Sequence, residues 1–115
     1  MQPMQVEYPD RSNLSEIIFD RRLRNLYERF LAEIRDLHDE VLFESTRVEV
    51  RFFFRSTLLC RVAPYRELFH VQIGDQDPWE IRVRDEATCV RTLDCVLGMF
   101  FEIFTRGEPI SPQAG

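Results

Sequence analysis

The residues that could do chemistry alternate with apolar residues in the middle of the chain, and most of them are arginines. The stretch from Arg47 to Arg55 reads R-V-E-V-R-F-F-F-R, so all of its charged residues stand at odd-numbered positions. Alternation with a period of two is typical of a strand with one buried and one exposed face. Arginines interleaved with Phe53 and His70 would suit single-stranded nucleic acid, because guanidinium groups hold phosphates while aromatic rings stack on bases.

We therefore predict a binding surface on the open face of a sheet, and three interpretations of it stay open. The first is a single-strand nucleic-acid platform, the second an apolar patch at Phe53, Leu59 and Leu68 that docks a protein, and the third a solvated face of cross-strand ion pairs. The net charge of −5 disfavours nucleic acid, although residues 46–84 hold seven arginines against five acidic residues. The predicted surface comprises Arg47, Arg51, Phe53, Arg55, Leu59, Arg61, His70 and Arg82.

No catalytic, metal or cofactor site is predicted. His70 could titrate near neutral pH, but no nucleophile or paired carboxylate is expected beside it, and His38 lies in a helical pattern. A small pocket between Tyr65, His70 and Trp79 is the weakest of the alternatives. The two histidines and three cysteines lack the spacing of metal ligands, and the glycines are too isolated to cradle a phosphate.

The cysteines also indicate in which cellular compartment the protein should be found. Cys60, Cys89 and Cys95 are odd in number and form no C-x-x-C pair, which favours reduced thiols. The chain shows no signal peptide and no apolar run long enough for a membrane span. We therefore expect a cytoplasmic protein without a membrane partner.

The length of 115 residues predicts one domain. Residues 1–12 are expected to form a flexible N-terminal arm, residues 13–106 a single α+β domain, and residues 107–115 a disordered C-terminal tail. Apolar residues recur at three- and four-residue steps from Leu14 to Leu42, which predicts an amphipathic first helix that ends near Glu44.

A helix of that length would overhang the strands that follow it. Its apolar stripe continues into the overhang, and we expect a second copy of the chain to cover these apolar residues. The alternative is a break near Asp20 that folds the first turns of the helix back. The predicted dimerisation residues are Ile17, Ile18, Phe19 and Leu23.

Four strands are predicted near residues 46–55, 57–62, 68–73 and 79–84, joined by connections too short for parallel pairing. Asp85 should cap a second helix that ends near Arg106. Gly98 lies inside this helix, where glycine is unfavourable, and the usual reason for a glycine there is the close approach of another element. The predicted apolar face of this helix contains Val90, Leu93, Leu97, Phe100, Phe101 and Phe104.

The predicted fold is a two-layer α+β sandwich, in which a four-stranded antiparallel meander is covered on one face by two helices. The predicted function is that of a non-enzymatic protein-interaction domain, adaptor-like or chaperone-like, that forms a homodimer and binds an unidentified protein. Single-stranded nucleic-acid binding through the arginine and aromatic residues of the open face is the alternative.

Overall fold

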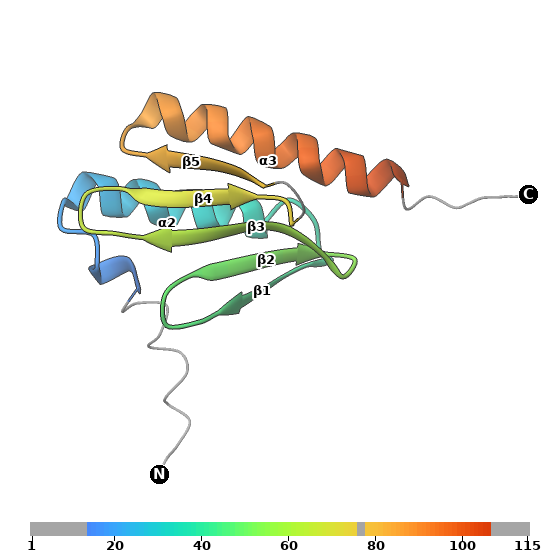
Figure 1. Cartoon of the computed structure of the whole chain (residues 1–115), viewed down its shortest axis with the longest axis horizontal. Helices are drawn as coiled ribbons and strands as arrows, with labels where there is room; N and C mark the ends of the chain where they lie inside the picture. Colours follow the sequence, from blue (N-terminus) through green and yellow to red (C-terminus); the bar gives the residue numbers. More distant parts are fainter. Residues whose placement is uncertain (1–13, 76–77, 107–115) are drawn as a thin grey trace, which may run out of the picture.

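The computed structural model describes residues 14–75 and 78–106. The arm and the tail predicted at residues 1–12 and 107–115 lie outside this part of the chain. The described residues form an α+β fold with an antiparallel sheet of five strands in the order β1-β2-β3-β4-β5 (Figure 1). The elements are α2 (Arg21–Arg35), β1 (Val41–Ser45), β2 (Val50–Phe54), β3 (Thr57–Pro64), β4 (Phe69–Ile73), β5 (Trp79–Val83) and α3 (Glu86–Arg106).

The predicted first helix is interrupted at Asp20. This residue has extended backbone, and its carboxylate accepts a hydrogen bond of 2.9 Å from the Leu23 N–H, as an N-cap does. The Arg24 guanidinium donates to the carbonyl oxygens of Ile18 and Phe19, so these two oxygens are occupied by a side chain. The preceding turn at residues 14–16 is thereby separated from α2. The prediction of a continuous helix is wrong, and the alternative of a break near Asp20 is confirmed.

The same helix also ends earlier than predicted. After Asp36 the chain turns, and the His38 ring packs 5.2 Å from the Phe54 ring, centroid to centroid. Val41 is buried and stands opposite Phe54 in the register of β1 and β2. Residues 41–45 therefore add a fifth strand, because pairing with β2 gives their backbone and Val41 better partners than another helical turn would.

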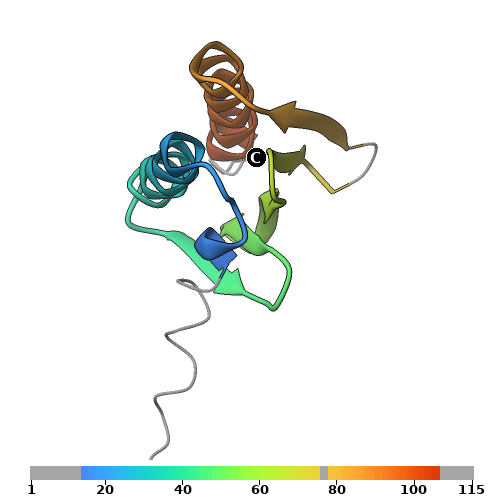
Figure 2. The same cartoon turned by 90° about the vertical axis from the view of Figure 1, so that its left-hand side faces the viewer.

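Both helices lie on one side of the sheet (Figure 2). Tyr27 and Phe30 of α2 contact Phe69 of β4, and Phe100 of α3 contacts Phe54 of β2, with ring centroids 4.7–5.4 Å apart. Alternate residues of β2, β3 and β4 complete the core, and we call the opposite side of the sheet the outer sheet face. The buried strand residues that follow this alternation are Val50, Phe52, Phe54, Cys60, Val62, Phe69, Val71 and Ile73.

The α3 helix begins as predicted, because Asp85 accepts a hydrogen bond of 2.8 Å from the Thr88 N–H. Its buried face differs from the predicted one and contains Cys89, Thr92, Val96, Phe100 and Ile103. Of the six predicted apolar positions, only Phe100 is buried, and the other five are half-buried or exposed. In the part of the chain that the structure describes, no helix is both long and apolar enough to cross a membrane.

Candidate binding surface on the outer sheet face

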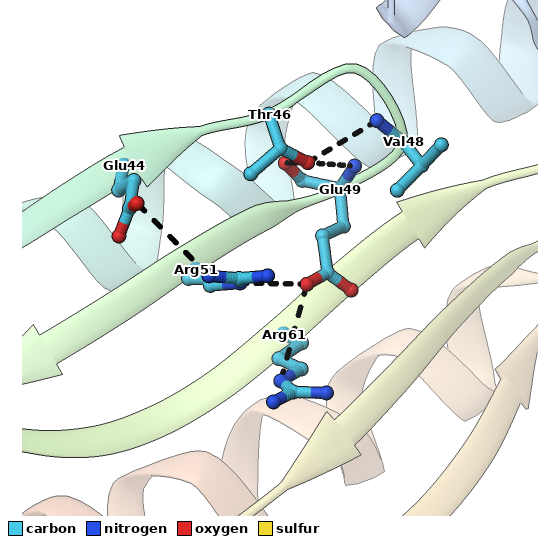
Figure 3. Close-up of polar contacts among 6 residues, drawn as sticks. All are labelled: Glu44, Thr46, Val48, Glu49, Arg51 and Arg61. Atoms are coloured by element: carbon cyan, nitrogen blue, oxygen red, sulfur yellow. Dashed lines mark hydrogen bonds and ion pairs between the residues drawn. The ribbon is translucent and has the colours of Figure 1, made fainter.

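The outer sheet face contains an ionic cluster around Glu49. Arg51 Nε donates a hydrogen bond of 2.7 Å to Glu49 Oε2, and Arg61 Nε lies 3.9 Å from the same oxygen (Figure 3). A carboxylate oxygen of Glu44 lies 4.0 Å from Arg51 Nη1. The hydrogen bond that Arg51 donates to Glu49 raises the pKa of Arg51 above its usual value. Two arginines thus share two carboxylates, and most of their charge is balanced within the chain.

The turn between β1 and β2 fixes the position of Glu49. Thr46 Oγ1 accepts hydrogen bonds from the N–H groups of Val48 and Glu49, and it donates one to the Glu49 carbonyl oxygen (Figure 3). The Thr46 N–H donates to the same carbonyl oxygen at 2.8 Å. Because Glu49 is held by its backbone, its carboxylate is pre-positioned between Arg51 and Arg61.

An apolar patch lies beside this cluster. Leu42 of β1 and Leu58 of β3 both stand opposite Phe53 of β2 in the strand register. Leu42 is 66% exposed, Phe53 is half-buried, and Leu58 is buried outside the main core cluster. We call Leu42, Phe53 and Leu58 the outer apolar patch.

Leu59 does not belong to the outer sheet face, and its prediction there is wrong. The register of β2 and β3 shifts between Phe52 and Phe53, so that Cys60 pairs with Phe52 while Leu58 pairs with Phe53. Leu59 is the extra residue of this bulge, and it is fully buried within the core cluster. The bulge therefore exchanges the predicted roles of Leu58 and Leu59.

Two predicted arginines also leave the face. Arg55 and Ser56 form the β2–β3 turn with φ of 53° and 67°. The Arg55 guanidinium carbon lies 5.2 Å from the ring centroid of Phe104 in α3, and its Nε donates to Glu40 at 3.2 Å. Arg55 thus points to the helix side. Arg47 is exposed in the β1–β2 turn, at the margin of the outer sheet face.

The far end of the face carries His70 and Arg82. They stand opposite each other in β4 and β5, and His70 Nε2 lies 3.7 Å from Glu80 Oε1. The Tyr65 ring is 6.5 Å from the His70 ring. Trp79 pairs instead with Ile73, whose side chain faces the core, so the suggested pocket between Tyr65, His70 and Trp79 does not form.

The four predicted dimerisation residues are divided by the break at Asp20. Ile18 and Leu23 are buried in the chain's own core, whereas Ile17 and Phe19 keep exposed surface. The Phe19 ring is covered on one side by the Arg66 guanidinium, 4.8 Å from its centroid. Because α2 begins at Arg21, the described residues contain no overhanging helix, and these four residues do not require a second copy to cover them.

Two cavities lie away from the outer sheet face. One of about 280 Å³ lies between α2 and the β1–β2 hairpin, and its lining includes Tyr27, Leu31, Phe43 and Phe52. The Tyr27 hydroxyl is buried without a hydrogen-bond partner among the described residues, and burial raises the pKa of Tyr27. The other, of about 580 Å³, lies where α2 and α3 begin, and its charged lining is balanced: Asp20, Arg22, Arg29, Arg84, Asp85 and Glu86.

In residues 14–75 and 78–106, no three His, Cys, Asp or Glu side chains are grouped as metal ligands. The outer apolar patch contains two residues that are not predicted on this face: the apolar pattern places Leu42 in a helix and Leu58 in the core. The apolar run Leu58-Leu59-Cys60 was a usable signal for the bulge, because it breaks the alternation of β3.

No family model, no curated protein and no solved structure matches this chain.

Proposed function

We propose that the chain is a non-catalytic protein-interaction domain that binds a partner protein on its outer sheet face. In this proposal the fold acts as a two-layer sandwich, whose helices provide the core on one side and leave the strands to bind on the other. The outer apolar patch is the observation that carries the proposal, because it lies next to a fixed ionic cluster on a face that neither α2 nor α3 covers.

The chemistry of the face suggests the character of its partner. Leu42 and Phe53 would bury apolar side chains, while Arg61 has a buried Nε without a hydrogen-bond partner among the described residues. The remaining N–H groups of Arg61 can donate hydrogen bonds to a carboxylate in a planar, bidentate contact. A segment that combines apolar residues with an acidic one fits these features best.

Single-stranded nucleic acid is the less favoured occupant. Its affinity depends on arginine charge that is free to neutralise phosphates. Glu49 and Glu44 already balance Arg51, Arg55 points to the helix side, and the whole chain carries a net charge of −5.

A location in a reducing compartment is part of the same proposal. Cys60, Cys89 and Cys95 are all free thiols, and two of them are buried in the core. Buried free cysteines are common in proteins of the cytoplasm, where disulfides are rare.

Peptide selection tests the proposal directly. A display library of random linear peptides is selected on the immobilised domain, and individual peptides are then measured by fluorescence anisotropy. We expect enriched peptides to contain apolar and acidic residues, and their affinity to fall at least about tenfold in Phe53→Asp and Leu42→Asp. The matched control is Trp79→Asp, an exposed aromatic residue outside the patch, which should bind as the wild type does.

Either of two results would contradict the proposal. One is that no peptide is enriched, or that enriched peptides bind Phe53→Asp and Leu42→Asp unchanged while both variants remain folded by circular dichroism. The other is salt-sensitive binding of a mixed-sequence single-stranded oligonucleotide that is lost in Arg51→Glu and Arg61→Glu, which would establish the nucleic-acid function instead.

A further inference from the structure

The α3 helix carries apolar residues on two sides, although only one side meets the core. The core side is formed by residues such as Val96, Phe100 and Ile103. Val90 and Phe101 are 50% and 55% exposed, and Leu97 is half-buried between them. We call Val90, Leu97 and Phe101 the second α3 stripe. Their spacing of seven and four residues places them on one side of the helix, where a surface helix usually carries polar residues.

Gly98 lies beside this stripe and has no reason to be glycine within the chain. A Cβ atom at Gly98 would meet nothing within 4 Å, so neither the sheet nor α2 requires its absence. Glycine in a helix interior is less favourable than alanine by about 1 kcal/mol. An exposed notch next to Leu97 is what a closely approaching partner helix would use.

We propose that two copies of this chain associate through antiparallel packing of their α3 helices. A two-fold axis between Leu97 and Gly98 places Leu97 of each copy in the notch at Gly98 of the other, so the same contact forms twice. Phe101 then covers the apolar surface next to the notch. Because the stripe and the notch lie in one helix, each copy provides the apolar side chain for one of the two contacts and the glycine notch for the other.

The charges at the margin of the stripe favour the same arrangement. Arg91 and Glu102 are exposed and eleven residues apart, about three helical turns, so they lie on the same side of α3. Under the two-fold axis, Arg91 of one copy approaches Glu102 of the other at both ends of the contact. Among the described residues of one chain, the Glu102 carboxylate makes an exposed contact of 3.6 Å with Arg106, which is a weak competitor.

This dimer differs from the one predicted from the sequence and is independent of the proposed function. The sequence-based dimer depends on Ile17, Ile18, Phe19 and Leu23, and the break at Asp20 removes the overhanging helix on which it rests. The α3 contact lies on the helix side of the molecule (Figure 2), so the outer sheet face of each copy stays accessible.

Sedimentation equilibrium of the full chain, over concentrations from about 1 to about 100 μM, tests the dimer. We expect a mass near twice the monomer's 13.8 kDa at the upper end. Phe101→Asp should shift the chain to monomer. Gly98→Gln should also do so while leaving thermal stability unchanged or higher, because glutamine is the better helix former. Tyr65→Asp, which changes an exposed aromatic residue beside His70 and away from α3, should remain dimeric.

Charge variants make the test specific for the antiparallel arrangement. Arg91→Glu should weaken the dimer, and the double variant Arg91→Glu with Glu102→Arg should restore it. Asp94→Ala should tighten it, since Asp94 lies beside the stripe and would lose water on association. A monomeric wild type at the highest concentration would overturn the proposal. So would a dimer that Phe101→Asp and Gly98→Gln leave intact, or a double variant no tighter than Arg91→Glu.

Discussion

Arg51 and Glu49 lie two residues apart in the chain and are joined by a hydrogen bond of 2.7 Å on the outer sheet face. The Glu49 side chain is only 15% exposed, and its carboxylate also lies within 3.9 Å of Arg61. A run of arginines that resembles a nucleic-acid platform in the sequence is therefore largely neutralised in the fold. Glu49 is the residue that decides how positive this face is.

Replacing Glu49 with Gln should increase affinity for a single-stranded oligonucleotide. The variant keeps an oxygen that can accept from Arg51 but frees the charge of both arginines, so binding should rise and should fall again with added salt. Fluorescence anisotropy at low and high salt measures this. Glu80→Gln changes the net charge equally at the far end of the face, and it should have the smaller effect. Equal effects of the two variants would show that Glu49 has no special role.

Leu59 should be critical for stability, whereas Leu42 should not. Leu59→Ala leaves a cavity in the core and should lower the free energy of unfolding by about 2–5 kcal/mol. Leu42→Ala removes an exposed side chain and should change it by less than about 0.5 kcal/mol. Urea denaturation of the two variants checks this, and similar losses would mean that the bulge does not turn Leu59 into the core.

The α+β class, the antiparallel meander and the start of α3 could be predicted because they depend on local signals. The alternation of β2 and β4 and the capping position of Asp85 act over a few residues. The second α3 stripe shows the limit of such patterns. Val90, Leu97 and Phe101 fit a helical apolar face, but which apolar side of α3 meets the core depends on how the sheet curves beneath it.

The wrong predictions have two physical causes, which are contacts between residues distant in the chain and local side-chain hydrogen bonds that the apolar pattern does not reveal. Helical periodicity continues past Asp20, and the helix is interrupted because Arg24 occupies the carbonyl oxygens of Ile18 and Phe19, while the Phe19 N–H donates to the Arg66 carbonyl oxygen. Val41 also fits the helical period, yet it joins the sheet opposite Phe54. The position of Leu59 depends on a register shift between two strands, which periodicity alone does not determine.

The three cysteines should differ in reactivity. Burial raises the pKa of Cys60, and it raises that of Cys89 to about 11, so both remain thiols near neutral pH. Cys95 is the partly exposed one of the three. Titration with a thiol reagent at about pH 8 should label one cysteine in the folded chain and all three in denaturant. Peptide mapping should place the native label on Cys95, and rapid native labelling of Cys89 would contradict the structure.

Asp85 should make stability depend on pH at the start of α3. The hydrogen bond from the Thr88 N–H lowers the pKa of Asp85 in the folded state. A group with a lowered folded pKa stabilises the fold above its unfolded pKa, about 3.9 for Asp, and this contribution is lost as the pH falls through the folded value. Asp85→Asn can still cap the helix but cannot titrate at this position.

The free energies of unfolding of the wild type and Asp85→Asn should therefore differ most above about pH 5 and converge as the pH falls. Urea denaturation from neutral to acidic pH measures the difference. Asp85→Ala, which loses the cap altogether, should be the least stable of the three at neutral pH. A difference between the wild type and Asp85→Asn that stays constant over the whole range would show that the Asp85 carboxylate is not stabilised by its hydrogen bond to Thr88.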